Sequence, residues 1–165
     1  MTPYISGFFE SDDFWKVVAL RVSHDAPAVK HALLAVSALH EAAERSGKAD
    51  KLGGLEDGFA VMEYNKAIRC LVELKDQDSM TGPAVSLVTC VLFVCLEFMR
   101  GNISAAQKHI RSGSAILDSE FNSTETDVMD ELSTTFSRMK LQSILFDSDG
   151  IYADRQVRKH IGASA

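Results

Sequence analysis

The sequence is poor in the residues that build cross-linked or fibrous proteins. Its 165 residues include three cysteines, three prolines and one tryptophan. Three cysteines in a chain of this length exclude a scaffold built on disulfides and favour a reducing compartment. Because 46% of the residues are hydrophobic, the chain is not disordered. The composition predicts one soluble globular domain over residues 1–165, which is large enough to form a hydrophobic core.

Basic residues are also scarce. Seventeen lysines and arginines stand against 23 aspartates and glutamates, which gives a formal net charge of −6. This balance opposes binding to phosphates, so we expect no direct contact with nucleic acid and no membrane partner. The longest uncharged apolar stretch, residues 83–96, is shorter than the ~20 residues that span a bilayer. The N-terminus lacks the pattern of a signal peptide, and we expect the chain in the nucleus or cytoplasm.

The motifs of common enzyme and cofactor sites are missing as well. None of the patterns GxSxG, P-loop, GxGxxG or EF-hand occurs, and Cys70, Cys90 and Cys95 match neither a zinc spacing nor a CxxC motif. His40 and Glu44 share a helix face at i and i+4, but no third ligand accompanies them. We therefore expect no cofactor and no metal, and interpret the cysteines as small buried hydrophobic residues.

What the sequence does contain is a succession of helix patterns. Pro27 suits the first turn of a helix, and apolar residues then repeat every three to four positions as far as Arg45, before Gly47. The uncharged run that follows Pro83 is long for a strand and favours a central helix ending at Gly101. The predicted helices are residues 27–45, 83–100 and 105–117, a shorter one carrying Phe14, Trp15, Val18 and Val22, one from the polar cap 123–127 to about residue 146, and a short basic one from Tyr152.

One further helix is predicted between the glycines of residues 53–54 and the loop of residues 78–82. Its apolar stripe is assigned to Phe59, Met62, Ala67, Ile68 and Leu71, and its outer face to Glu63, Lys66, Arg69 and Glu73. No strand–glycine–helix unit appears, which excludes a nucleotide-binding α/β fold. The sequence predicts an all-α fold, a bundle of about six to seven helices arranged as stacked antiparallel hairpins.

Four polar residues are the candidates for acid, base or orienting groups. His24 and His31 flank a helix start, where the helix dipole favours a neutral imidazole, and each also fits a turn or packing role. Glu97 closes the uncharged run and needs a partner; Arg100, His109 and Arg111 are the candidates. The Glu97 contact is interpreted either as an inter-helix ion pair or as a polar anchor in a ligand pocket, with His109 as a further candidate.

Several blocks in order resemble a known family. They are FW at residues 14–15, SH at 23–24, PAVKHALLAVSALHE at 27–41, YNKAI at 64–68, CVLFVCLEFMRGN at 90–102, AAQKHIRSGSAIL at 105–117 and FSRMKLQSILF at 136–146. Together, over about residues 14–146, they resemble the regulatory middle-homology region of fungal zinc binuclear cluster transcription factors. The resemblance implies a helical domain that regulates activity, dimerises or senses metabolites. The zinc head of that family needs six closely spaced cysteines, so DNA binding is carried over to no residue here.

The resemblance leaves three uses open. The first is a non-catalytic regulatory domain that associates with itself. The second is a small-molecule binder or enzyme of secondary metabolism, with a site between helices lined by aromatic residues. The third is a partner that pairs with a related transcription factor and withholds a DNA-binding head. The candidate lining residues are Trp15, Tyr64, Phe93 and Phe98, and the chain is expected to be a piece of a longer regulator or a stand-alone relative.

Overall fold

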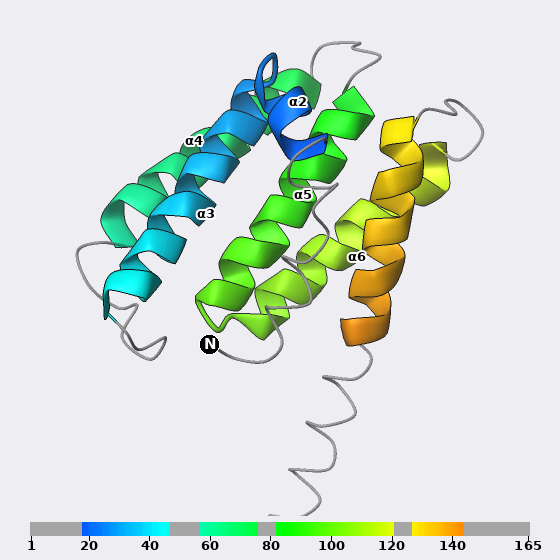
Figure 1. Ribbon diagram of the computed structural model, residues 1–165. Coiled ribbons are helices and arrows are strands. Elements are labelled where there is room, and N and C mark those ends of the chain that lie inside the picture. Colours follow the sequence, from blue (N-terminus) through cyan, green and yellow to red (C-terminus); the bar gives the residue numbers. More distant parts are fainter. Residues whose placement is uncertain (1–17, 47–56, 76–81, 121–126, 144–165) are drawn as a thin grey trace, which may run out of the picture.

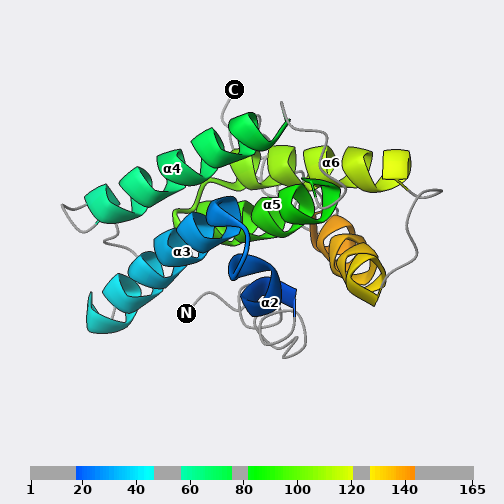
Figure 2. The same cartoon turned by 90° about the horizontal axis from the view of Figure 1, so that it is seen from above.

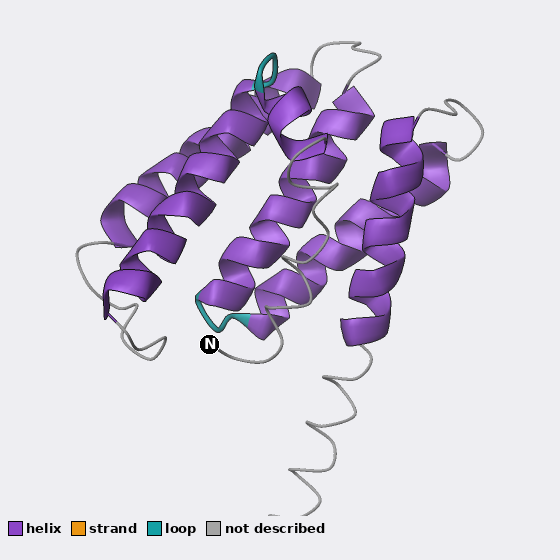
Figure 3. Ribbon diagram, in the orientation of Figure 1, coloured by secondary structure: helices purple, strands orange, loops and turns teal. Residues whose placement is uncertain are grey.

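The computed structural model describes residues 18–46, 57–75, 82–120 and 127–143 (Figure 1). Within these ranges the regular structure is helical throughout and no strand occurs (Figure 3), which confirms the all-α prediction. The helices are α2 (Leu20–Ser23), α3 (Pro27–Ser46), α4 (Asp57–Lys75), α5 (Gly82–Met99) and α6 (Ile103–Glu120), followed by a helix over residues 127–143 that we call the 127–143 helix.

The helices pair into two hairpins. α3 packs along α4, and α5 packs along α6. The two hairpins meet where α3 lies against α5, and α4 and α6 both lie on the same side of this central pair (Figure 2). The 127–143 helix adds to the same core through Leu132, Phe136 and Met139. The predicted stacking of antiparallel hairpins is confirmed.

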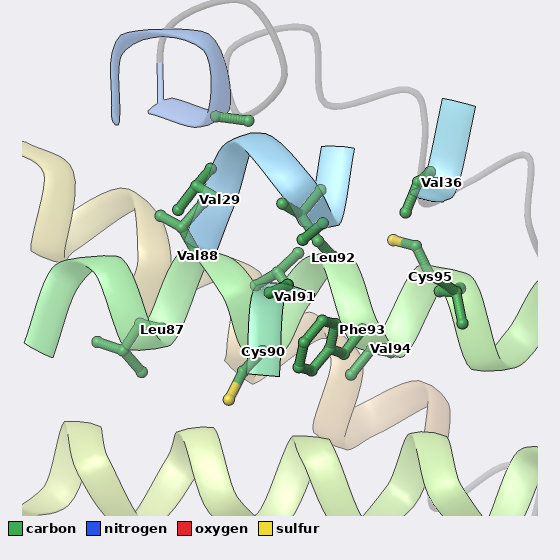
Figure 4. Packing of buried hydrophobic residues seen from close by; sticks show 14 of the residues in the cluster. Val29, Val36, Leu87, Val88, Cys90, Val91, Leu92, Phe93, Val94 and Cys95 are labelled. Atoms are coloured by element: carbon green, nitrogen blue, oxygen red, sulfur yellow. The ribbon is translucent and has the colours of Figure 1, made fainter. Parts of the chain in front are cut away.

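α5 is the central helix, because it is apolar on every side. All its residues from Leu87 to Glu97 are buried. Val88 lies beside Val29 of α3, while Cys90 and Phe93 point to the opposite side, toward α6 (Figure 4). Among the described residues α5 has the length and hydropathy to cross a membrane, a property that core helices share, and most of it is covered by other helices.

The observed helix ends follow the predicted ones closely. α3 begins at Pro27 as predicted and buries Val29, Val36 and Leu39. α6 begins at Ile103, two residues before the predicted start, because the side-chain oxygen of Asn102 accepts a hydrogen bond from the backbone N–H of Ala105. The predicted burial of Cys90 and Cys95 is confirmed. Phe14, Trp15, residues 144–146 and the basic helix from Tyr152 lie outside the described residues.

The prediction for the two faces of α4 was wrong in part. Glu63, assigned to the outer face, is 3% exposed, whereas Phe59, Met62 and Ile68 of the predicted stripe are exposed. Ala67 and Leu71 of the stripe do face the core, where Ala60 is buried beside them. The physical reason is close packing: small residues allow α3 to approach α4, and the large apolar side chains that would hold the helices apart lie outside.

Candidate functional site

Side chains from three helices meet beside the turn between α5 and α6. Tyr64 of α4 places its hydroxyl oxygen 3.2 Å from Nε2 of His109 on α6. The ring of Phe93 on α5 lies between them, with its centroid 4.4 Å from that of Tyr64 and 5.2 Å from that of His109. The carboxylate of Glu97, one helical turn after Phe93, lies close enough to Tyr64 to raise the pKa of its hydroxyl. We call these four residues the Tyr64–Glu97–His109 cluster, with Phe93 as its aromatic wall.

The turn itself fixes the position of Glu97. Gly101 has a φ of 73°, the left-handed conformation that glycine adopts without strain. Its N–H donates to the carbonyl of Phe98, and the N–H of Asn102 donates to the carbonyl of Glu97 over 2.8 Å. These two bonds form a Schellman motif, which ends α5 at Met99, two residues after Glu97, and is followed directly by α6. The hairpin therefore brings His109 back alongside the end of α5.

Burial and the Glu97 charge shift the ionisation of the neighbouring groups. Burial is the largest cause that raises the pKa of Tyr64 to about 12, and the Glu97 carboxylate adds to it. Burial also lowers the pKa of His109, while Glu97 opposes that change. Near neutral pH, Tyr64 is therefore a phenol and His109 a neutral imidazole. The cluster is a polar, uncharged shell around one carboxylate.

The Glu97 carboxylate lies beside the hydrogen bond between Tyr64 and His109 and raises the pKa of both groups. One of its oxygens, Oε2, is buried and has no hydrogen-bond partner.

A second polar cluster joins α3 to α4. Nδ1 of His31 lies 2.6 Å from Oε2 of Glu63, and Nζ of Lys66 lies 2.6 Å from Oε1 of the same carboxylate. Lys66, and then His31, lower the pKa of Glu63, which is therefore ionised at neutral pH. Both carboxylate oxygens have donors, so this cluster is complete. Its geometry fits a structural contact between two helices rather than a binding site.

Comparison with known proteins gives the chain its relatives. The family described as "Fungal specific transcription factor domain" matches residues 1–145. This chain belongs to that family. The chain is also similar to the aspercryptin biosynthesis cluster-specific transcription regulator atnN of Emericella nidulans, with 30% identity over 93 residues. The aligned part is 54% of this chain and 15% of that regulator, and no solved structure matches.

This fungal transcription factor domain brings half of its sequence-predicted candidates together. Tyr64, Phe93, Glu97 and His109 form the cluster described above. Of the others, His24 is exposed beside Asp25 and His31 is bound to Glu63, while Phe98 is half-buried against the core and Trp15 lies outside the described residues. Glu97 of α5 lies near His109 of α6, which is one of the partners that the sequence offers for it.

Two residues of the domain were not recognised in their actual roles. Tyr64 was treated as an aromatic wall, but its hydroxyl lies close to Glu97, a residue for which only basic partners were weighed. Glu63 was placed on the solvent face. The available signal was the spacing of Ala60, Glu63 and Ala67, which is that of a close-packed helix face. No group of three or more metal-binding side chains occurs among the described residues.

Proposed function

We propose that this chain is a regulatory and interaction domain of a transcription regulator, which works by self-association and makes no contact with DNA itself. Family membership and the likeness to a cluster-specific transcription regulator support the regulatory role. The net charge of −6 supports the separation from DNA. Because the matched part covers 15% of that relative, nuclear location and control of a biosynthesis cluster belong to the same proposal.

The observation that carries self-association is the outward face of α4. Met62, Asn65, Arg69 and Val72 are all exposed and repeat at three and four residues, so they form one stripe along the helix, which we call the α4 outer stripe. Met62 is 44% exposed and Val72 is 61% exposed. Large apolar side chains at both ends of an exposed stripe are typical of a surface that another helix covers.

The order of residues in the α4 outer stripe fits a second copy of the same stripe. If two α4 helices lie antiparallel about a two-fold axis level with Ala67, Met62 of each copy faces Val72 of the other. In the same register Asn65 faces Arg69, and the amide oxygen of Asn65 can accept from the guanidinium group. A two-fold interface requires such self-complementarity, because each contact occurs twice. The stripe meets this requirement in both its apolar and its polar pairs.

Sedimentation equilibrium on the 165-residue chain tests the proposal. We expect the mass of a dimer for the unchanged chain and a concentration-dependent shift to monomer for Val72→Glu. Leu141→Glu, an equally exposed apolar position on the 127–143 helix, is the matched control and should remain dimeric. A monomer at all concentrations, or equal behaviour of the two variants, contradicts the role of α4. Pairing with a related full-length regulator through the same stripe should be lost in the Val72→Glu variant as well.

A second function, the binding of a small molecule, is favoured by one specific observation. The Oε2 atom of Glu97 is a buried acceptor without a donor, at the inner end of a cluster whose outer members are partly exposed. A buried oxygen in this state is one hydrogen bond short.

A further inference from the structure

We propose that the Tyr64–Glu97–His109 cluster is a binding site for the ammonium group of a small aromatic amine. The site goes beyond self-association, because it lies at the end of α5 and involves no member of the α4 outer stripe. Its innermost atom is Oε2 of Glu97, which is buried and lacks a hydrogen-bond partner. The residue is 4% exposed, so solvent does not supply the missing donor.

The charge of Glu97 selects a cationic donor. The Glu97 carboxyl group raises the pKa of both Tyr64 and His109. Burial keeps His109 neutral, so the imidazole does not balance that charge. An N–H donor that carries a positive charge forms a shorter and stronger hydrogen bond to a carboxylate than a neutral donor does. An anionic ligand would be repelled by the same oxygen.

The aromatic residues indicate that the rest of the ligand carries an aromatic ring. The rings of Tyr64 and Phe93 lie at an interplanar angle of 59°, and Phe93 makes the same angle with the ring of His109. These three rings pack against one another beside Glu97, and aromatic faces attract a cation within about 6 Å of the ring centre. An ammonium group joined by a short linker to an aromatic ring therefore matches both the acceptor and its surroundings.

The partly exposed pair Tyr64 and His109 controls access to this acceptor. Their hydrogen bond measures 3.2 Å, at the long end of the usual range, and both side chains are partly exposed. A ligand reaches Glu97 when this pair separates, and its ammonium group then binds Oε2. The charge of Arg100, in the turn after Glu97, lowers the pKa of Tyr64. The ammonium group of the ligand would compete with this cation for Glu97.

Nuclear magnetic resonance titration with three matched probes tests the proposal: benzylammonium, benzyl alcohol and benzoate. We expect benzylammonium to shift the resonances of Tyr64, Glu97 and His109 and to show nuclear Overhauser contacts with the ring of Phe93. Benzyl alcohol should bind more weakly and benzoate not at all. Glu97→Gln should weaken benzylammonium binding about 10-fold or more, because it removes the charge and keeps the shape. Glu73→Gln, with the same charge change on an exposed position of α4, should leave the affinity unchanged.

Equal binding of the three probes, equal affinity in the two variants, or contacts elsewhere on the surface would overturn the assignment. If Glu97→Gln does not fold, the order of the probes and the contacts with Phe93 in the unchanged chain decide the matter. Dimer mass is not a readout here, so failure of this site and failure of the α4 interface are distinguishable.

Discussion

Gly113 of α6 lies directly against the ring of Phe136 on the 127–143 helix. A Cβ atom at position 113 would overlap two carbons of that ring, and Phe136 is 1% exposed. The absence of a side chain at Gly113 therefore sets how closely the 127–143 helix approaches α6. Through this contact the last described helix packs against the two hairpins.

Gly113→Ala should destabilise the domain. In an ordinary helix this change stabilises by about 1 kcal/mol, because glycine is a poor helix former. Here the added methyl group displaces a buried ring, and we expect a net loss of about 1–3 kcal/mol in the free energy of unfolding. Urea unfolding measures it. Gly58→Ala in α4, where a Cβ meets open space, is the control and should be neutral or stabilising. Equal effects of the two changes would show that the Phe136 contact is not tight.

The central part of the fold could be predicted because one local pattern decided it. Residues 87–97 form a buried run in which even the last residue, Glu97, is only 4% exposed, and the sequence shows this run as an uncharged stretch followed by one charged residue. The turn at Gly101 could be predicted for the same reason, since glycine marks the left-handed position after a helix.

The arrangement around α4 could not be predicted, because it depends on residues far apart in sequence. Glu63 is buried because His31, 32 residues earlier, supplies a hydrogen bond from α3. Tyr64 meets His109 over a separation of 45 residues. The local spacing of residues predicts neither of these two contacts. The helical spacing of apolar residues favours a buried face with Phe59, Met62 and Ile68, but the packing of α3 on small residues leaves these three side chains outside.

His31→Leu should destabilise the contact between α3 and α4. Glu63 is buried and ionised, and it would keep Lys66 but lose the donor that now lies 2.6 Å from its Oε2. We expect a loss of about 1–3 kcal/mol in the free energy of unfolding at neutral pH. His24→Leu is the matched control, because His24 and its partner Asp25 are both exposed, and it should change stability by less than about 0.5 kcal/mol. Similar losses in both variants would contradict a structural role for the His31–Glu63 pair.

His109 should make the domain less stable as the pH falls below neutral. Burial lowers the pKa of His109 in the folded chain below its ordinary value of 6.5. The unfolded chain therefore binds this proton at a higher pH than the folded chain, so protonation favours unfolding between 6.5 and the lowered value. In His109→Gln, the free energy of unfolding should fall less between neutral pH and about pH 5 than in the unchanged chain. His24→Gln provides the comparison, and parallel curves for all three chains would show that His109 does not titrate differently on folding.

Charge substitutions at Asn65 should change the dimer in opposite directions. In the proposed two-fold arrangement Asn65 faces Arg69 of the second copy, and the contact occurs twice. Asn65→Arg places two like charges opposite each other at both contacts and should weaken dimerisation. Asn65→Glu creates two ion pairs and should strengthen it, each pair contributing about 0.2–1 kcal/mol at low salt. Both variants leave the buried face of α4 untouched, so their free energies of unfolding as monomers should be similar. Sedimentation equilibrium at low and high salt measures the two dissociation constants, and their difference should shrink as salt screens the charges. If both substitutions shift the dimer in the same direction, Asn65 and Arg69 do not face each other and the two-fold register is wrong.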